Sequence, residues 1–260
     1  MIDNSNNDGL VEQNETVTDG RVSGEMDYLE GSGDQPALPA ATVILVRDRP
    51  ETSGEGVEVL MLRRDSRLAF AGGMWVFPGG KVDPGDFALD APDDLQRAEL
   101  NAAAREAAEE SGLVVDPAAL VRLSHWTPPP QATKRYSTAF FVAPAPRGTV
   151  VIDDGEIRDH QWVNPAAALE AHRRGEIELA PPTYITLTLL ADPSSTTELI
   201  DDVRTGDIEH FSTRIATDGD LVVALYHGDV AYGDVELVAS DGPRHRLWLD
   251  PTGWRYERVT

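Results

Sequence analysis

The feature that most constrains this chain is a glycine turn followed along the sequence by a helix with a cluster of acidic residues. An apolar run leads into the turn at residues 77–80 (FPGG), and residues 105–113 (REAAEESGL) have the composition of a helix that ends at a glycine. Residues three and four apart are neighbours on a helix, so Glu106, Glu109 and Glu110 project from the same side. Like charges at that spacing destabilise an isolated helix by roughly 0.2–0.5 kcal/mol per pair. A divalent cation would reverse that cost, because Mg²⁺ prefers carboxylate oxygens and often completes its shell with phosphate oxygens.

The flanks of the acidic segment predict a complete helix. Pro92 and the two aspartates after it favour a helix start, and Gly112 is a residue type that commonly follows a helix end. Arg105 stands four residues before Glu109, where it can hold that carboxylate by a charge-assisted hydrogen bond. A stripe of small and apolar residues predicts close packing on a sheet. The stripe contains Leu100, Ala103, Ala104, Ala107 and Ala108.

The order of these elements resembles the signature of the Nudix hydrolases, Gly-x5-Glu-x7-Arg-Glu-U-x-Glu-Glu-x-Gly-U, where U is a bulky apolar residue. The helix half matches well, since only Ala107 is smaller than the family usually has at its position. The matching residues are Arg105, Glu106, Glu109, Glu110, Gly112 and Leu113.

The turn half departs from that signature. Counted from Gly80, Asp86 stands where the family has a glutamate, and residues 87–97 form an insertion of 11 residues. We assign the glutamate's role to Asp86. The alternatives within and near the insertion are Asp90, Asp93 and Glu99.

The resemblance implies a Nudix-type α/β/α sandwich with a mixed β-sheet. It also implies hydrolysis of the diphosphate bond in a small-molecule nucleoside diphosphate linked to another group, assisted by Mg²⁺ or Mn²⁺. Metal ions suit this reaction because they activate water and neutralise diphosphate oxygens. In the family, the equivalents of Glu106, Glu109 and Glu110 mostly bind the metal and the arginine, here Arg105, orients them. The carbonyl oxygen of Gly80 is a further expected ligand.

The catalytic base differs between members of the family. Glu106 is one candidate, and a glutamate from a later loop is the other. In this chain we choose Glu156, which precedes the strand-like residues 160–163. An ordinary turn glutamate is an equally good interpretation of Glu156.

Arginines near the turn suit a phosphate ligand, because a guanidinium can donate two parallel hydrogen bonds. Residues 40–46 and 57–62 predict two strands, and Arg63 and Arg67 follow the second. Their position partly resembles the Nudix branch that hydrolyses coenzyme A, and the split signature resembles a longer group that includes an acyl-coenzyme A diphosphatase. We therefore expect Arg63 and Arg67 to bind substrate, with solvated strand-end charges as the alternative.

Two further substrate contacts are expected around a proline-rich loop. Residues 123–131 and 135–142 predict two strands joined by that loop, because prolines do not continue a central strand. Trp126 is a candidate wall for a base or acyl group, and Arg135 a candidate phosphate contact. A core aromatic and a surface arginine fit the same pattern.

The chain is expected to divide into three parts. Residues 1–36 are acidic with hardly any apolar run, which predicts disorder. Residues 37–200 are the expected Nudix domain, in which residues 164–175 and 181–190 predict two helices. Residues 201–260 form an expected β-rich extension.

The extension is predicted to contain two strands and a hairpin. Residues 221–225 and 235–238 predict the strands, and the hairpin turns at residues 250–253. We favour a structural cap as its role. A cover over the substrate pocket and a homodimer contact are the alternatives.

Composition narrows the function classes. The net charge of −23 argues against nucleic-acid binding, which needs Lys and Arg to displace counterions from phosphates. The chain has no stretch of about 20 apolar residues for a membrane span, and its lack of Cys excludes thiol catalysis. These features favour a cytoplasmic location. The resemblance to the coenzyme A branch implies coenzyme A or an acyl-coenzyme A as the substrate, with ADP-ribose or NADH as the alternative. A non-catalytic nucleotide-binding regulator is the hypothesis from another class.

Overall fold

The structure is a computed structural model that describes residues 36–259 apart from 51, 53–54, 69–70 and 154. The acidic segment predicted at residues 1–36 lies outside the described residues except for Pro36. None of the described helices is long and apolar enough to cross a membrane.

Within the described residues, eight strands form one mixed sheet in which β3, β2, β1, β6, β5 and β8 are neighbours in that order, while β4 pairs with β1 and β7 with β2. β1 runs parallel to β6, and β5 runs parallel to β8. The other pairs are antiparallel, which confirms the predicted mixed sheet. The strands are β1 (Leu38–Asp48), β2 (Val57–Arg64), β3 (Trp75–Val76), β4 (Gly79–Lys81), β5 (Val121–Thr127), β6 (Tyr136–Pro144), β7 (Ile157–Val163) and β8 (Glu209–Ser212).

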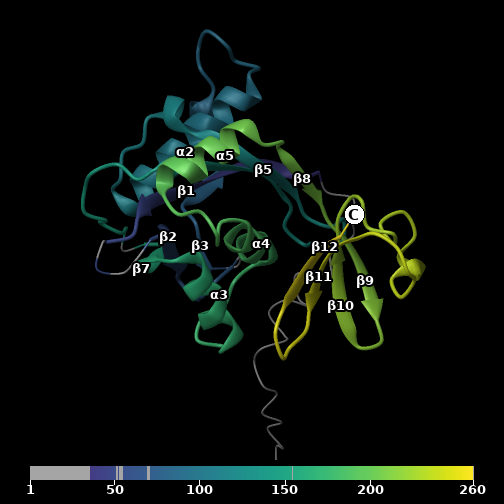
Figure 1. Ribbon diagram of the computed structural model, residues 1–260. Helices are drawn as coiled ribbons and strands as arrows, with labels where there is room; N and C mark the ends of the chain where they lie inside the picture. The colour runs from purple at the N-terminus through teal and green to yellow at the C-terminus, as the bar shows by residue number, and fades with distance from the viewer. Residues whose placement is uncertain (1–35, 51, 53–54, 69–70, 154, 260) are drawn as a thin grey trace, which may run out of the picture.

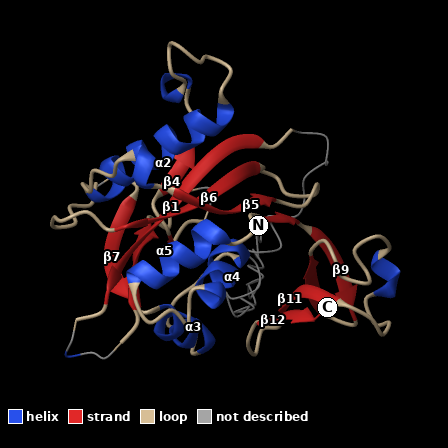
Figure 2. Ribbon diagram, turned by 45° about the horizontal axis from the view of Figure 1, so that its top comes forward, coloured by secondary structure: helices blue, strands red, loops and turns tan. Residues whose placement is uncertain are grey.

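Helices cover both faces of this sheet, as the two ribbon views show (Figures 1 and 2). One face packs against α2 (Leu95–Ser111), and the other against α3 (Pro165–Arg173), α4 (Pro181–Leu189) and α5 (Thr196–Thr205). Alternation along β2 divides its side chains between the two layers: Leu60 and Leu62 pack on the α2 side, and Met61 packs on the other side. The fold is therefore the predicted Nudix-type α/β/α sandwich.

The helix α2 forms where its capping residues and alanines predict it. The carboxylate of Asp94 accepts a hydrogen bond from the backbone N–H of Arg97, and Gly112 ends the helix with a φ of 70°. Of the predicted stripe, Ala103, Ala104 and Ala107 are buried, while Leu100 and Ala108 are half-buried. The small side chains let the helix lie close to the sheet.

A second sheet forms the predicted C-terminal β extension, with strand order β12, β11, β10, β9. The hairpin around residues 250–253 is confirmed, because β11 and β12 pair in antiparallel fashion on either side of it. The strands are β9 (Arg214–Asp218), β10 (Leu221–Leu225), β11 (Arg244–Leu249) and β12 (Arg255–Val259).

The strand predicted at residues 235–238 is wrong. The 3₁₀ turn η5 (Val235–Leu237) forms there instead, capped by the Asp234 carboxylate, which accepts from the N–H of Glu236. Val238 is buried against this sheet with Val223 and Leu225. Val238 is thus buried by packing on the face of the sheet rather than by pairing along its edge.

The extension is continuous with the larger sheet. β8 lies within the residues predicted as extension, yet it pairs with β5. Only Thr213 separates β8 from β9. The hairpin also contacts the helical layer, because the Tyr184 hydroxyl donates a 2.9 Å hydrogen bond to the carbonyl of Trp254. The domain boundary at residue 200 and the role of the extension stay predictions.

Candidate active site

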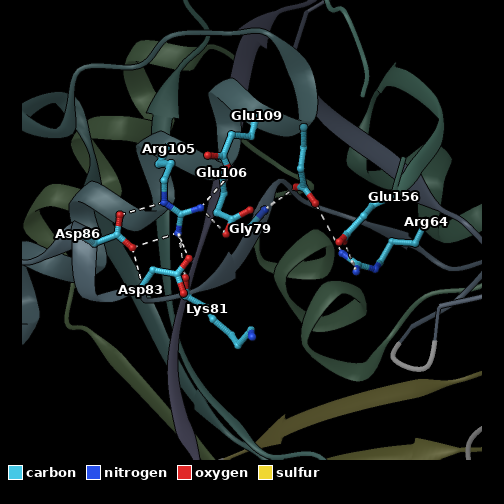
Figure 3. Close-up of polar contacts among 10 residues, drawn as sticks. Arg64, Gly79, Lys81, Asp83, Asp86, Arg105, Glu106, Glu109 and Glu156 are labelled. Atoms are coloured by element: carbon cyan, nitrogen blue, oxygen red, sulfur yellow. Dashed lines mark hydrogen bonds and ion pairs between the residues drawn. The ribbon is translucent and has the colours of Figure 1, made fainter. Parts of the chain in front are cut away.

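Arg105 is the centre of a polar cluster at the turn and the acidic helix (Figure 3). Its Nε and Nη2 each donate a 3.0 Å hydrogen bond to the carboxylate of Asp86. Its Nη1 lies 2.9 Å from both Oε1 of Glu106 and Oε2 of Glu109, and Nη2 also donates to the carbonyl of Lys81 at 3.0 Å. The hydrogen bonds to Asp86, reinforced by Glu106, hold the pKa of Arg105 above its usual range. A permanently charged fork therefore fixes two of the predicted metal ligands.

Asp86 is positioned by the short turn η3 (Pro84–Asp86), which precedes the insertion. Its carboxylate is buried and also accepts a 2.8 Å hydrogen bond from the N–H of Asp83. The alternatives lie elsewhere: Asp90 pairs with Arg97, Glu99 pairs with Arg122, and Asp93 is exposed. Among these four acids, Asp86 is the one that contacts Arg105.

The insertion at residues 87–97 leaves this contact intact. Its residues 87–94 form a loop that projects from the top of the molecule in Figure 1, and residues 95–97 begin α2. A bridge between Ala88 and Ala91 and the ion pair between Asp90 and Arg97 hold the loop. A surface loop tolerates added residues at small entropic cost, so η3 and α2 still meet.

Glu106 lies directly against the backbone of the glycine turn. A Cβ atom at Gly80 would be 2.3 Å from Oε1 of Glu106, so no side chain fits between them. Burial raises the pKa of Glu106, although Arg105 opposes the shift.

Glu110 occupies the most buried position of the acidic cluster, with 8% of its side chain exposed compared with 59% for Glu109. The N–H of Gly79 donates a 2.9 Å hydrogen bond to Oε2 of Glu110. Burial raises the pKa of Glu110 to about 8 despite this bond and the nearby Arg64. The described residues thus compensate its negative charge only in part.

Glu156 is brought to the acidic helix by Arg64. Nη2 of Arg64 donates a 3.0 Å hydrogen bond to Glu156, and Nη1 lies 3.6 Å from Glu110 (Figure 3). The sequence interpretation missed Arg64 and chose its neighbour. The signal was present, since the alternation of Leu60 and Leu62 along β2 places residue 64 on the α2 side.

The four predicted substrate residues have different surroundings. Arg63 is exposed and follows Met61 on the opposite side of β2 from Arg64. Arg67 has 77% of its side chain exposed and pairs with Asp65 at 2.6 Å. Arg135 donates to the carbonyl of Pro128 at 3.5 Å.

Trp126 does not fit the predicted role of a pocket wall. It is 4% exposed and stacks on Phe211 with ring centroids 3.9 Å apart. Phe211 belongs to β8, a strand that the sequence interpretation did not foresee, and it covers the indole. Trp126 is therefore a core residue.

The donor set suits a hard divalent cation, because all the candidate side-chain ligands are carboxylates. Gly80 leaves room for its backbone beside Glu106, and the charge of Glu110 is incompletely compensated. Among the described residues, no three His, Asp or Glu side chains are grouped closely enough to hold an ion. The Glu106 and Glu109 carboxylates bind Arg105, whereas Glu110 binds Gly79. The residue types and their surroundings fit a metal, which would replace part of these contacts.

A comparison with models of protein families identifies the family of this chain. The model described as NUDIX domain matches residues 37–182, more than half of the chain. The chain belongs to the Nudix family. Nudix hydrolases generally use divalent metal ions, in agreement with the donor set, and the chain is a Nudix-type hydrolase. No curated protein matches the sequence.

Solved structures support the fold. A NUDIX hydrolase from Alicyclobacillus acidocaldarius is 22% identical, with a TM-score of 0.58 over 67% of this chain and 100% of that chain. An Ap4A hydrolase from C. elegans is 21% identical, with a TM-score of 0.41 over 58% of this chain and 93% of that chain. The NUDIX domain of Shewanella oneidensis NrtR, complexed with ADP ribose, is 17% identical, with a TM-score of 0.44 over 64% and 94%. The first supports the sandwich architecture, and the weaker two carry no functional argument.

Proposed function

We propose that this Nudix hydrolase cleaves the diphosphate bond of a nucleoside diphosphate linked to another group, in a reaction that depends on Mg²⁺ or Mn²⁺. The observation that carries the proposal is the acidic face of α2. Arg105 donates hydrogen bonds to Glu106 and Glu109 on this face, and the Gly79–Gly80 backbone lies against Glu110 and Glu106. Carboxylates held this way are prepared for a cation and then for a phosphate oxygen.

Each residue has a proposed role. Glu106, Glu109 and Glu110 hold the metal, and the Gly80 carbonyl is a further ligand. When bound, the metal neutralises diphosphate oxygens and activates the attacking water. Arg105 orients Glu106 and Glu109, and Asp86 holds Arg105 in place of the family glutamate. Glu156 accepts a proton from the water.

Coenzyme A or an acyl-coenzyme A is the proposed substrate. The support is the arginine pattern at the end of β2, since Arg63 in the strand and Arg67 after it are both exposed. ADP-ribose or NADH is the alternative substrate class. A panel of these compounds with product identification separates them: 3′,5′-ADP and a phosphopantetheine product support the first, whereas AMP with a sugar phosphate or nicotinamide mononucleotide supports the second.

The metal assignment is tested with Glu109→Gln and Glu110→Gln under Mg²⁺ or Mn²⁺ titration. Each variant should lose most turnover, because one carboxylate ligand becomes a neutral amide. Glu176→Gln is the matched control, since Glu176 is exposed just beyond α3 and, in the described part of the chain, pairs with Arg174. Retained turnover in either site variant would refute the metal assignment.

The same titration tests a non-catalytic role. Asp86 and the insertion are the departures from the family signature that would permit a nucleotide-binding regulator. Binding of ADP-ribose or coenzyme A without hydrolysis at saturating Mn²⁺ would favour it.

Imaging of a tagged chain tests the predicted cytoplasmic location, and light scattering tests the predicted homodimer.

A further inference from the structure

Arg64 joins two carboxylates that come from distant parts of the chain. Its Nη1 lies 3.6 Å from Oε1 of Glu110 on α2, and its Nη2 donates a 3.0 Å hydrogen bond to Oε2 of Glu156 in the loop before β7. Figure 3 shows the guanidinium of Arg64 turned toward Glu156. One side chain therefore bridges the acidic helix and the loop that carries the proposed base.

The backbone around Arg64 is fixed on both sides. The N–H of Arg64 donates to the carbonyl of Met74 at 3.0 Å, and its carbonyl accepts from the N–H of Gly73 at 3.1 Å. The next residue, Asp65, donates its N–H to the carbonyl of Glu156 at 2.7 Å. The guanidinium thus extends from a fixed point toward a loop that is bound to the same strand end.

The two carboxylate contacts of Arg64 do not use all of its side-chain donors. Its side chain is 16% exposed, and its Nε is buried without a hydrogen-bond partner among the described residues. Buried donors are normally paired, and an exception calls for an explanation. Here the two carboxylates set the orientation of the fork, at the expense of that third donor.

Glu156 depends on this contact for its direction. Its side chain is 57% exposed, and Arg64 is the ion-pair partner found for it in the described part of the chain. An exposed glutamate without a partner samples several rotamers. The pairing with Arg64 holds the carboxylate toward Glu110 instead.

We propose that Arg64 is a positioning residue that holds the Glu156 carboxylate beside the acidic face of α2. The inference rests on the proposed function, in which Glu156 accepts a proton from the attacking water. Arg64 acts through Glu156 and does not touch the reacting atoms. Misplacing a catalytic group by about 1 Å costs on the order of 100-fold in rate, so the effect of losing Arg64 is measurable.

A double-mutant cycle tests the coupling. Arg64→Gln and Glu156→Gln should each lower kcat on the order of 100-fold with KM within about threefold of the unchanged protein. The kcat of the double variant should be no lower than that of the less active single variant, because both changes remove the same positioned carboxylate. Arg64→Lys should recover only part of the loss, since an ammonium keeps the charge but lacks the planar fork.

Three kinetic outcomes would overturn the proposal. Losses that multiply in the double variant would show that the residues act independently. A raised KM with unchanged kcat in Arg64→Gln would make Arg64 a substrate contact. Full activity in Arg64→Lys would show that charge suffices without the bridge. Arg204→Gln is the control, because Arg204 pairs with Asp201 on the surface of α5, and it should leave kcat unchanged.

A crystal structure of Arg64→Gln supplies a readout that needs no turnover. The Glu156 carboxylate should turn away from Glu110 in this variant and keep its position in Arg204→Gln. An unmoved Glu156 in Arg64→Gln would overturn the positioning role. Absence of hydrolysis by the unchanged protein would instead refute the proposed function, and the structural comparison would still test Arg64.

Discussion

A single methyl group at Gly80 is expected to disable the site without unfolding the protein. A Cβ atom there would lie 2.3 Å from Oε1 and 2.6 Å from Cδ of Glu106. These atoms end a flexible side chain, so the carboxylate moves by roughly 1 Å to reach van der Waals separation. The backbone of Gly80 does not have a positive φ, so alanine adds no conformational strain.

The displacement sets the size of the effect. A misplacement of about 1 Å in a catalytic group costs on the order of 100-fold in rate, which corresponds to about 2.7 kcal/mol in the activation barrier. The free energy of unfolding should change by less than about 1 kcal/mol, below the usual range for overpacking of a core. Gly80→Ala should therefore separate activity from stability.

Three measurements test this prediction against Gly85→Ala. A Cβ at Gly85 meets nothing within 4 Å, so that variant should match the unchanged protein. The measurements are kcat/KM on the substrate found in the panel, Mn²⁺ affinity by isothermal titration calorimetry, and urea unfolding. Normal turnover and Mn²⁺ affinity in Gly80→Ala would refute the reasoning, and a large loss of stability would show that the backbone moves instead of Glu106.

Two further predictions concern Asp86, which binds Arg105, and Glu110, which binds the backbone of the glycine turn. Asp86→Ala should reduce activity or metal affinity by about 10- to 100-fold, the usual cost of losing a group that supports metal ligands; the exposed Asp93→Ala is the control, and equal activities would contradict the role of Asp86. Burial raises the pKa of Glu110 to about 8 in the metal-free folded protein. Between about pH 5 and pH 8 the folded state therefore keeps a proton on Glu110 that the unfolded state has lost. Stability should therefore fall as pH rises through this window, by up to about 1.4 kcal/mol per unit. Urea unfolding in a chelating buffer measures how the free energy of unfolding changes with pH, and Glu110→Gln should flatten this dependence. Its absence in the unchanged protein would contradict the prediction.

The parts of this molecule that were predicted from sequence depend on short-range rules. The caps of α2 at Asp94 and Gly112 follow from side-chain hydrogen bonding and glycine conformation within one turn. The contact of Arg105 with Glu109 follows from their spacing on one helix. The alternation along β2 is equally local, and it runs from Leu60 and Leu62 to Arg64, two residues beyond the end of the predicted strand.

The errors arise where distant segments decide the environment. Trp126 follows a strand pattern that fits either a surface or the core, and Phe211 on a remote strand decides for the core. Val235 and Val238 have high strand propensity, but Asp234 caps a 3₁₀ turn and the sheet beneath buries Val238. Neither burial nor pairing partners can be deduced from a window of a few residues.

The position of β8 determines which sheet edge a shortened chain would expose. This strand pairs with β5 and fills one margin of the larger sheet, although it stands in the last fifth of the sequence. A chain cut at residue 200 would leave the backbone N–H and C=O groups of β5 open along that margin and uncover the indole of Trp126. Open strand edges are templates for association with other chains. A chain cut at residue 200 is therefore expected to associate more readily than the full chain, because the short edge strand β8 no longer covers β5.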